Sequence, residues 1–366
     1  MTFFYLTVLL PLLIAGVLVA GLRSPASVLG LVDRPSERKQ HSGDVPLVGG
    51  IAVFLAFIAV LPVLDISPTS VMPLMAGMVL LLFCGILDDL VELRSMFKCC
   101  IQAVAAGFIV LWGNTEVVSL GTVPVFGQLD LGWVAAPFTI LVVVGFINAM
   151  NMIDGLDGLA GGVAVVMLGW LAFCAVALGA DGVLMVIVSF AAAIGGFLWF
   201  NMRHPWQRSA KVFLGDAGSM PIGLAVAWFA IEVSNSPHSS SEIGISPAAI
   251  AWILAVPVID TISVMTRRMI RGISPFTPGR DHLHHMLLHL GQTPGQATAT
   301  MMALTASAGA FGVLGSNAGI SDFVLLTGLF GLALAHGVGL RRARWIIVRR
   351  LEQVQRDPND SKRLET

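Results

Sequence analysis

The residues of this chain that are best placed to do chemistry are five aspartates beside apolar runs. Asp88 and Asp89 lie in GILDDL, Asp154 and Asp157 in NAMNMIDGLDGLAGG, and Asp216 in FLGDAGSM. A carboxylate within a membrane helix costs about 2.5–3.5 kcal/mol on insertion scales, so each one needs a partner or a function. Adjacent carboxylates also repel each other unless a cation or a proton lies between them. The five aspartates together therefore indicate a site that attracts cations.

Asparagines extend this pattern. Asn148, Asn151 and Asp154 are spaced three residues apart, so on a helix they share one side. Asp157 follows at the same spacing, although the glycines beside it interrupt a helix. Carboxylate and amide oxygens are the ligands that a hard cation such as Mg²⁺ prefers. The stripe therefore predicts a Mg²⁺ site, at which Mn²⁺ could substitute.

Each motif also has a purely structural interpretation. Asp216 precedes an apolar run, where it would meet the positive end of a helix but would also serve as an ordinary helix cap. The Asp88–Asp89 pair is compatible with a solvated loop, and the Asn/Asp stripe with hydrogen bonds between helices. Because basic residues lie beside these motifs, a joint site for Mg²⁺ and phosphate is the favoured interpretation.

The basic residues supply the phosphate half of that site. Lys39 lies in DRPSERKQHSGDVPLVGG, and Lys98 follows the paired aspartates within one short segment. Arg280 comes directly before a helix that we expect to begin near Asp281. A helix N-terminus binds anions through its free backbone N–H groups. These three basic residues are therefore candidates for phosphate binding.

The motif DHLHHMLLHLG adds histidines. His282 and His285 share one helical face, whereas His284 points elsewhere. A histidine cluster can bind zinc, but this one has neither cysteine partners nor the HExxH spacing. We therefore expect these imidazoles to bind phosphate, and His289 to be an ordinary surface residue.

The composition defines the elements that must position these residues. Hydrophobic residues make up 56% of the 366 residues, charged residues only 12%, and the mean hydropathy is +0.85. A soluble domain carries roughly 25% charged residues, so a soluble enzyme is excluded. A spanning helix needs about 20 apolar residues. The sequence predicts an all-α polytopic membrane protein with eleven spans, at about 3–22, 47–64, 71–87, 99–113, 133–152, 158–178, 182–201, 217–234, 248–266, 297–315 and 322–340.

The basic residues also predict the orientation of these spans. With the N-terminus outside, the inside segments are 23–46, 88–98, 153–157, 202–216, 267–296 and the tail from 341, and they contain all 21 Lys and Arg residues. Basic residues are enriched on the cytoplasmic side of membrane proteins. The pattern predicts a periplasmic N-terminus, a cytoplasmic C-terminus and a cytoplasmic location for all five aspartates.

Two further expectations concern organisation. Residues 1–340 form one integral-membrane domain, followed by a basic to polar cytoplasmic tail over 341–366. The outside segment 114–132 alternates β-branched residues around Pro124 and Gly127, which predicts a short hairpin.

The motifs, in this order, resemble the polyprenyl-phosphate N-acetylhexosamine-1-phosphate transferases. The resemblance covers residues 20 to 296 and rests on the first-loop pattern, GILDDL, NAMNMIDGLDGLAGG, FLGDAGSM and DHLHHMLLHLG. Any one motif is weak, but five in order are specific. The HxHH form and eleven spans are most similar to the bacterial branch that uses UDP-GlcNAc and undecaprenyl phosphate. The related MurNAc-pentapeptide translocases usually show a different histidine motif and ten spans.

This resemblance implies a Mg²⁺-dependent reaction in the bacterial inner membrane, in which UDP-N-acetylglucosamine and undecaprenyl phosphate give undecaprenyl-diphosphate-GlcNAc and UMP. Membrane lipids are further partners, a homo-oligomer is left open, and no nucleic-acid partner is expected. The resemblance assigns Asn151 and Asp216 to the metal. It assigns catalytic roles to Asp88, Asp89, Asp216 and His282. It assigns substrate binding to Lys39, Lys98, Asn148, Asp154, Asp157, Arg280, His284 and His285.

Several alternatives stay open at this point. A phosphomonoester has a second pKa near ~6, so the lipid phosphate is already a nucleophile at neutral pH and direct attack is favoured. A covalent intermediate on an aspartate such as Asp216 is the competing scheme. The donor could be another UDP-N-acetylhexosamine or UDP-MurNAc-pentapeptide. Intramembrane carboxylates would equally serve a cation-coupled transporter, and a membrane scaffold for polysaccharide assembly is a third class.

Overall fold

The computed structural model describes residues 5–34, 43–64, 66–124, 126–236, 245–275, 277, 279 and 281–356, with side chains as far as residue 342. Within them the chain is almost entirely helical, which confirms the all-α prediction. The helices are η1 (Tyr5–Leu9), α2 (Leu10–Leu29), α3 (Gly49–Val60), η2 (Leu61–Val63), α4 (Pro68–Val91), α5 (Ser95–Gly107), η3 (Phe108–Trp112), η4 (Gly132–Val134), α6 (Ala135–Ile153), α7 (Leu159–Leu178), α8 (Asp181–Asn201), α9 (Asp216–Asn235), α10 (Pro247–Ile253), α11 (Ala255–Ile270), α12 (Leu283–His289), α13 (Pro294–Asn317) and α14 (Asp322–Arg356).

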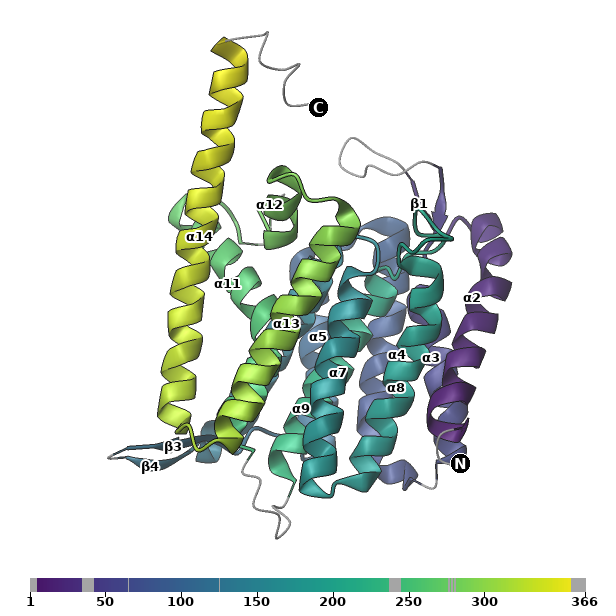
Figure 1. Cartoon of the computed structure of the whole chain (residues 1–366). Coiled ribbons are helices and arrows are strands. Elements are labelled where there is room, and N and C mark those ends of the chain that lie inside the picture. The colour runs from purple at the N-terminus through teal and green to yellow at the C-terminus, as the bar shows by residue number, and fades with distance from the viewer. Residues whose placement is uncertain are drawn as a thin grey trace.

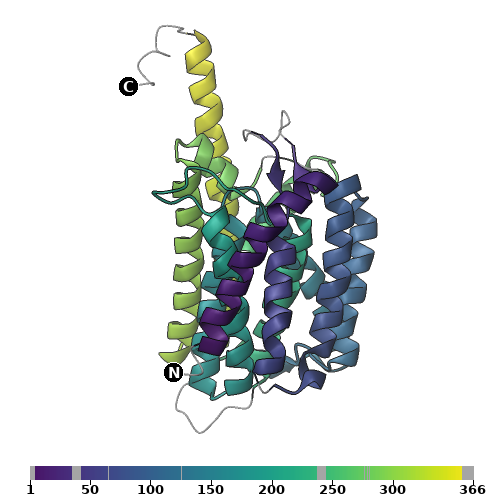
Figure 2. The ribbon, with the colours of Figure 1, turned by 90° about the vertical axis from the view of Figure 1, so that its right-hand side faces the viewer.

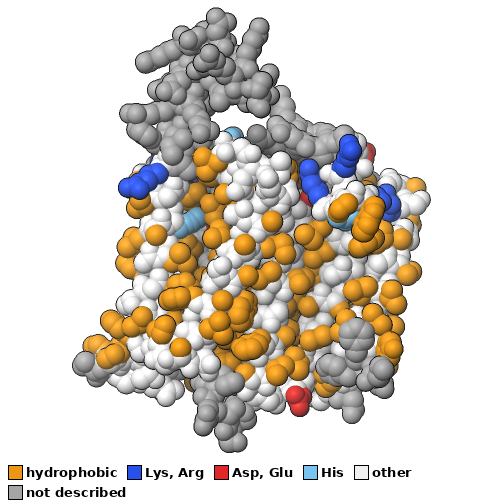
Figure 3. Space-filling model, in the orientation of Figure 1, with side chains coloured by type: hydrophobic (Ala, Val, Ile, Leu, Met, Phe, Trp, Pro, Cys, Tyr) orange, Lys and Arg blue, Asp and Glu red, His pale blue; other side chains and the backbone are white. Residues whose placement is uncertain are grey.

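Each of the eleven predicted spans coincides with a helical segment. In the described part of the chain, nine helices are long and apolar enough to cross a membrane by themselves. Of the two remaining predicted spans, 248–266 corresponds to the pair α10 and α11, and 47–64 corresponds to the shorter segment Gly49–Val63. On the face seen in Figure 3, apolar side chains cover the body of the bundle, and the visible Lys and Arg side chains lie towards one end. The chain is a multi-pass membrane protein.

The break between α10 and α11 has a local cause. The two helices meet at Leu254 with a bend of 72°. Pro257, in the first turn of α11, has no N–H to donate to Ile253, and its ring would clash with that carbonyl in a continuous helix. The sequence predicts one uninterrupted span over 248–266, whereas the structure shows this span broken at Leu254.

Helix α9 forms the centre of the bundle. It is the most buried of the nine candidate spans and packs against α3, α4 and α6. Glycines permit this close packing, as is common between membrane helices. A Cβ atom on Gly85 of α4 would lie 2.3 Å from Ala217 N, and one on Gly50 of α3 would lie 2.3 Å from Gly218 Cα. The first turn of α9 is therefore held tightly between two neighbouring helices.

The two ends of the bundle carry different elements (Figure 1). Helix α12 and the short pairing of β1 (Val32–Asp33) with β2 (Val45–Pro46) lie at one end, here called the α12 end. The antiparallel pair β3 (Ser119–Val123) and β4 (Gly127–Asp130) lies at the other, here called the hairpin end, and confirms the hairpin predicted in 114–132. In both side views α14 extends beyond the bundle at the α12 end (Figure 2). It continues past the predicted end of the last span, to Arg356.

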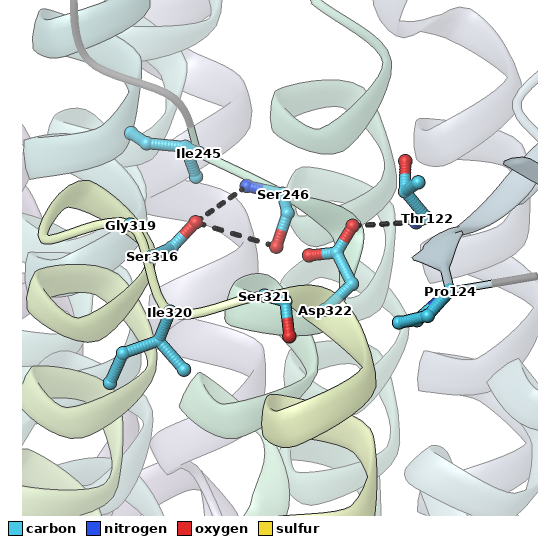
Figure 4. Close-up of a pocket in the computed structure, with 9 residues that line it drawn as sticks. All are labelled: Thr122, Pro124, Ile245, Ser246, Ser316, Gly319, Ile320, Ser321 and Asp322. Carbon is cyan, nitrogen blue, oxygen red and sulfur yellow. Dashed lines mark hydrogen bonds between the residues drawn. The ribbon is translucent and has the colours of Figure 1, made fainter. Parts of the chain in front are cut away.

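The hairpin end contains a cavity of about 400 Å³ (Figure 4). Its polar groups bond to one another: Asp322 accepts from the backbone N–H of Thr122 at 2.6 Å, and Ser316 Oγ accepts from the backbone N–H of Ser246 at 3.3 Å. The predicted chemical motifs are absent from its lining. This cavity is therefore not the predicted site.

Candidate active site

Lys98 joins two of the predicted carboxylates. Its Nζ lies 2.7 Å from Asp88 Oδ2 and 3.0 Å from Asp216 Oδ2. Helix α4 ends where Glu92 adopts φ 50°, and α5 begins at Ser95, so the chain turns sharply and brings Lys98 back beside Asp88. One ammonium group therefore bridges two carboxylates that are far apart in the sequence.

Asp89 has a different arrangement from its neighbour. Its two carboxylate oxygens accept from the backbone N–H groups of Asp216 (3.0 Å) and Ala217 (3.3 Å), which are the first residues of α9. The residue before them is Gly215, with φ +71°, and a Cβ there would lie 2.5 Å from Asp89 Oδ2. Asp89 thus caps α9 from another helix and fixes the position of Asp216. Its predicted catalytic role stays a prediction.

The asparagine stripe divides between two levels of the bundle. Asn151 Nδ2 donates to Asp216 Oδ1 at 2.8 Å and to Ser219 Oγ at 2.9 Å. Asn148 lies one turn deeper, where its Nδ2 donates to Gln102 Oε1 at 2.6 Å. Asn151 therefore belongs to the cluster of Asp216, whereas the contact described for Asn148 supports α5.

Asp154 lies just after the end of α6 and adds a further carboxyl group to the cluster. Burial raises the pKa of Asp154 to about 8, and the charges of Asp216 and Asp89 act in the same direction. The physical cause is that a buried carboxyl group beside other carboxylates favours its neutral form. A cation placed here would relieve that repulsion.

Asp157 connects the same loop to two other parts of the chain. Its Oδ2 accepts from Arg203 Nε at 2.7 Å and from the backbone N–H of Ala210 at 3.2 Å. Its carbonyl oxygen accepts from Thr298 Oγ1 of α13 at 3.1 Å. These contacts hold the loops after α6 and α8 together, and the predicted nucleotide contact of Asp157 stays a prediction.

The histidine motif lies against this loop. His284 is only 1% exposed, and a Cβ on Gly155 would lie 2.6 Å from His284 Nε2. Neither ring nitrogen of His284 has a hydrogen-bond partner among the described residues. Burial lowers the pKa of His284 to about 3, and the neighbouring His285, whose ring centroid is 4.2 Å away, acts in the same direction. His284 is therefore neutral at physiological pH.

His282 is held by a residue that the sequence analysis missed. Its Nδ1 lies 2.8 Å from Oδ2 of the fully buried Asp260. The available signal was an aspartate inside an apolar run, which insertion costs make unusual. His336, Gln102 and Ser219 were also missed, because single polar residues within apolar runs carry no pattern. Lys39 and Arg280, two predicted phosphate contacts, lie outside the described residues.

The donor set at the α12 end is compatible with a hard cation. Within the described residues, no three His, Cys, Asp or Glu side chains gather in an arrangement that would hold a metal ion. Mg²⁺, however, usually takes one or two protein carboxylates and completes its coordination with substrate phosphates and water. Asp216 and the amide oxygen of Asn151 could supply that limited number of protein ligands, and their predicted metal role stays a prediction.

Comparisons with known proteins show the family to which the chain belongs. The sequence profile of glycosyl transferase family 4 matches residues 71–234, a range that contains every one of the five aspartates. The chain is 35% identical over 347 residues to the undecaprenyl-phosphate α-N-acetylglucosaminyl 1-phosphate transferase of Escherichia coli O157:H7, covering 91% of this chain and 90% of that relative. The proteins of the same name from Salmonella typhi (35% identical, 91% and 90% covered) and Haemophilus influenzae (32% identical, 92% and 93% covered) are similar along the same length. The chain therefore belongs to glycosyl transferase family 4, together with these 1-phosphate transferases.

Proposed function

We propose that this protein transfers GlcNAc-1-phosphate from UDP-N-acetylglucosamine to undecaprenyl phosphate, giving undecaprenyl-diphosphate-GlcNAc and UMP. The names of its relatives support undecaprenyl phosphate as the acceptor and GlcNAc-1-phosphate as the transferred group. The observation that carries the proposal is the position of Lys98 between Asp88 and Asp216, at the first turn of the central helix. The reaction would be the first lipid-linked step of cell-envelope polysaccharide synthesis.

The main chemical difficulty is the approach of two anions. The lipid phosphate has a second pKa near ~6 and is mostly a dianion at neutral pH. The diphosphate of the nucleotide sugar repels it, so charge neutralisation matters more than a strong base. In the proposed site Lys98 provides a fixed positive charge beside Asp216.

Mg²⁺ would be held by Asp216 and Asn151, with Mn²⁺ able to substitute. When bound, the ion neutralises charge on the diphosphate oxygens. Asn151 already donates from Nδ2 to Asp216, so its amide oxygen remains for a cation. Asp89 keeps Asp216 in place by capping α9, and Asp154 adds a carboxyl group close by, whose charged form a bound cation would favour.

Asp88 would orient the lipid phosphate or act as a modest base. Both of its oxygens are engaged, one with Lys98 and one with the backbone N–H of Leu93, so its orientation is fixed. This favours direct in-line attack by the lipid phosphate. Incubation with UDP-GlcNAc alone should therefore give no phospho-enzyme, and a trapped phospho-aspartate would establish the covalent scheme instead.

The active site would face the cytoplasm of a bacterium from its inner membrane, with the N-terminus in the periplasm. The separation of all 21 basic residues onto one side of the predicted spans supports this orientation. A cysteine-accessibility experiment tests it: a cysteine introduced at Arg208, in the loop after α8, should react only with reagents that reach the cytoplasm.

The decisive experiment measures UMP release by the purified protein in detergent. Release should require UDP-GlcNAc, polyprenyl phosphate and Mg²⁺ together, and a panel of UDP-sugars should rank GlcNAc first. A preference for UDP-MurNAc-pentapeptide would change the donor but keep the reaction. Ion-gradient-driven uptake without UMP release would show that the protein is a transporter and not this enzyme. The carboxylates give little support to a transporter, because they gather at one end of the bundle and not at the midplane.

A further inference from the structure

The carboxylate of Asp260 lies outside the Lys98 cluster and has three neighbours of its own. It is fully buried in α11, with 0% exposed. Its Oδ2 lies 2.8 Å from His282 Nδ1, and its Oδ1 accepts from the backbone N–H of Leu283 at 2.9 Å. His336 Nε2, from α14, lies 3.3 Å from Oδ1, within ion-pair distance, although neither ring nitrogen of His336 makes a hydrogen bond among the described residues. One buried carboxylate thus joins α11, the start of α12 and α14.

The contact with His282 determines which atom of that imidazole is available. A carboxylate accepts a hydrogen bond from Nδ1–H, which leaves Nε2 as the nitrogen that can meet a substrate or another group. The second oxygen of Asp260 holds Leu283, the first residue of α12, so the ring and the backbone that carries it are fixed together. Asp260 therefore controls both the tautomer and the direction of His282.

This control extends along the motif to the loop after α6. The rings of His282 and His284 are stacked, with centroids 5.7 Å apart and an interplanar angle of 11°. His284 in turn packs against Gly155, one residue from Asp154. A rotation of the His282 ring would disturb this stack. It would therefore also disturb the packing of His284 beside the carboxylate cluster.

His336 brings the last helix into the same arrangement. Helix α14 packs against α11 and α12, although it is the least buried of the candidate spans. The side chain of His336 is only 10% exposed and faces Asp260. Leaving a buried carboxylate without its partners is costly, so the third contact supports the orientation of the other two.

We propose that Asp260 is a positioning residue for sugar-1-phosphate transfer, which acts through His282, and that His336 completes this support from α14. The proposal rests on the proposed function, since it assigns a task within that reaction. A residue that only stabilises the fold would affect the amount of folded enzyme, whereas a positioning residue changes turnover by folded enzyme.

The first test is a double-mutant cycle on the full-length protein in detergent, with UMP release as the measurement. Asp260→Asn reverses the hydrogen bond to Nδ1 and should lower kcat about 10- to 100-fold, the effect typical of a residue that orients a ligating histidine, with KM for UDP-GlcNAc changed less than threefold. In a His282→Ala background the same substitution should have no further effect. Equal losses in both backgrounds, or none in the first, would overturn the proposal.

The second test uses α14 and does not depend on the folding of an Asp260 variant. His336→Leu should lower kcat about tenfold, and His336→Gln, which keeps a polar group beside the carboxylate, should retain more of the wild-type kcat. His289→Gln, an exposed histidine at the end of α12, is the matched control and should leave kcat unchanged. If His336→Leu keeps the wild-type kcat, His336 and α14 have no part in positioning His282.

Failure of the proposed function looks different from failure of this inference. If wild-type protein releases no UMP with any UDP-sugar, the proposed function is wrong. If wild-type protein is active and the Asp260 and His336 variants are equally active, only the positioning role is wrong.

Discussion

The two ends of α9 carry acidic residues in contrasting surroundings. At the α12 end, Asp216 shares Lys98 with Asp88 and accepts from Asn151, while Asp89 caps the same turn. At the hairpin end, Glu232 accepts a single hydrogen bond of 2.6 Å from the hydroxyl of Thr115. Asp322, also at the hairpin end, accepts from a backbone N–H. At the α12 end Lys98 joins two carboxylates, whereas at the hairpin end Glu232 and Asp322 each have a neutral partner.

This difference separates a structural acid from a candidate site. Burial does not distinguish the ends, since both contain partly buried acids in a membrane protein. Repulsion does: like charges gathered together lose stability unless a cation or a substrate group offsets them. The acids described at the hairpin end therefore need no further partner. The carboxylates at the α12 end would be stabilised by a further positive charge. The predictions below set one end against the other.

Removal of divalent metal should have the largest effect. UMP release should fall to background in excess chelator and return with Mg²⁺ or Mn²⁺, because the diphosphate charge is then neutralised again. Mg²⁺ should also raise the Tm of wild-type protein and of Asp322→Asn, but not of Asp216→Asn. Full activity of metal-depleted enzyme would contradict the proposal that the α12 end, unlike the hairpin end, binds a divalent cation.

Asp216→Asn should lower kcat about 10³-fold. The substitution removes the charge that pairs with Lys98 and the main proposed metal ligand, and loss of one electrostatic contact in an active site costs about 10²–10³-fold. UMP release at saturating substrates measures the effect. Asp322→Asn is the control at the hairpin end, and more than a tenth of wild-type activity in Asp216→Asn would contradict the assignment.

Asp89→Ala should have an intermediate effect. Two backbone N–H groups at the start of α9 lose their acceptor, which costs about 0.5–2 kcal/mol of stability for a typical cap. Because Asp216 lies in that turn, we expect kcat to fall about tenfold or more as well. Thermal unfolding and UMP release measure the two effects, and Asp89→Asn, which keeps one acceptor, should be milder in both. An inactive but fully stable Asp89→Ala would point to a direct catalytic role.

Acid should destabilise the histidine motif. The pKa of His284 is lowered from 6.5 to about 3, so below pH 6.5 the unfolded chain binds a proton that the folded protein does not. The corresponding stability is fully present above pH 6.5 and is lost as the pH falls, by about 2 kcal/mol at pH 5. The groups that face this ring are His282, His285 and Asp260. The fall in Tm between pH 7 and 5 should be smaller in His284→Asn than in wild type, and equal falls would contradict the prediction.

The hairpin end should give the smallest effects. Glu232→Gln keeps an acceptor for Thr115, so kcat should stay within twofold of wild type. Thr115→Val leaves the carboxylate without its donor and should cost about 1 kcal/mol of stability, again without loss of activity. Unfolding in denaturant and UMP release measure these changes. A tenfold loss of kcat in Glu232→Gln would show that this end also takes part in the reaction.

The sequence predicted the helices well, but it predicted less well which polar side chains contact one another. Apolar runs must form helices in a bilayer, because no water satisfies their backbone groups, so every predicted span appears as a helical segment. The shared face of Asn148 and Asn151 was predicted from their spacing, yet only Asn151 reaches Asp216. The reason is depth: one helical turn of about 5.4 Å places Asn148 beside Gln102. The interruption at Leu254 was missed although Pro257 was visible, since proline is tolerated in many membrane helices.

The sequence by itself therefore determined the class of protein, the family and the clustering of acidic motifs on one side of the spans. These features follow from local hydrophobicity, the distribution of charge and the order of short motifs. Only the tertiary structure decided which carboxylate has which partner: Lys98 with Asp88 and Asp216, Asp89 with the start of α9, and Asp260 with His282. The physical reason is that a helix is built from hydrogen bonds between near neighbours, whereas each of these long-range contacts depends on how helices from distant parts of the chain pack together.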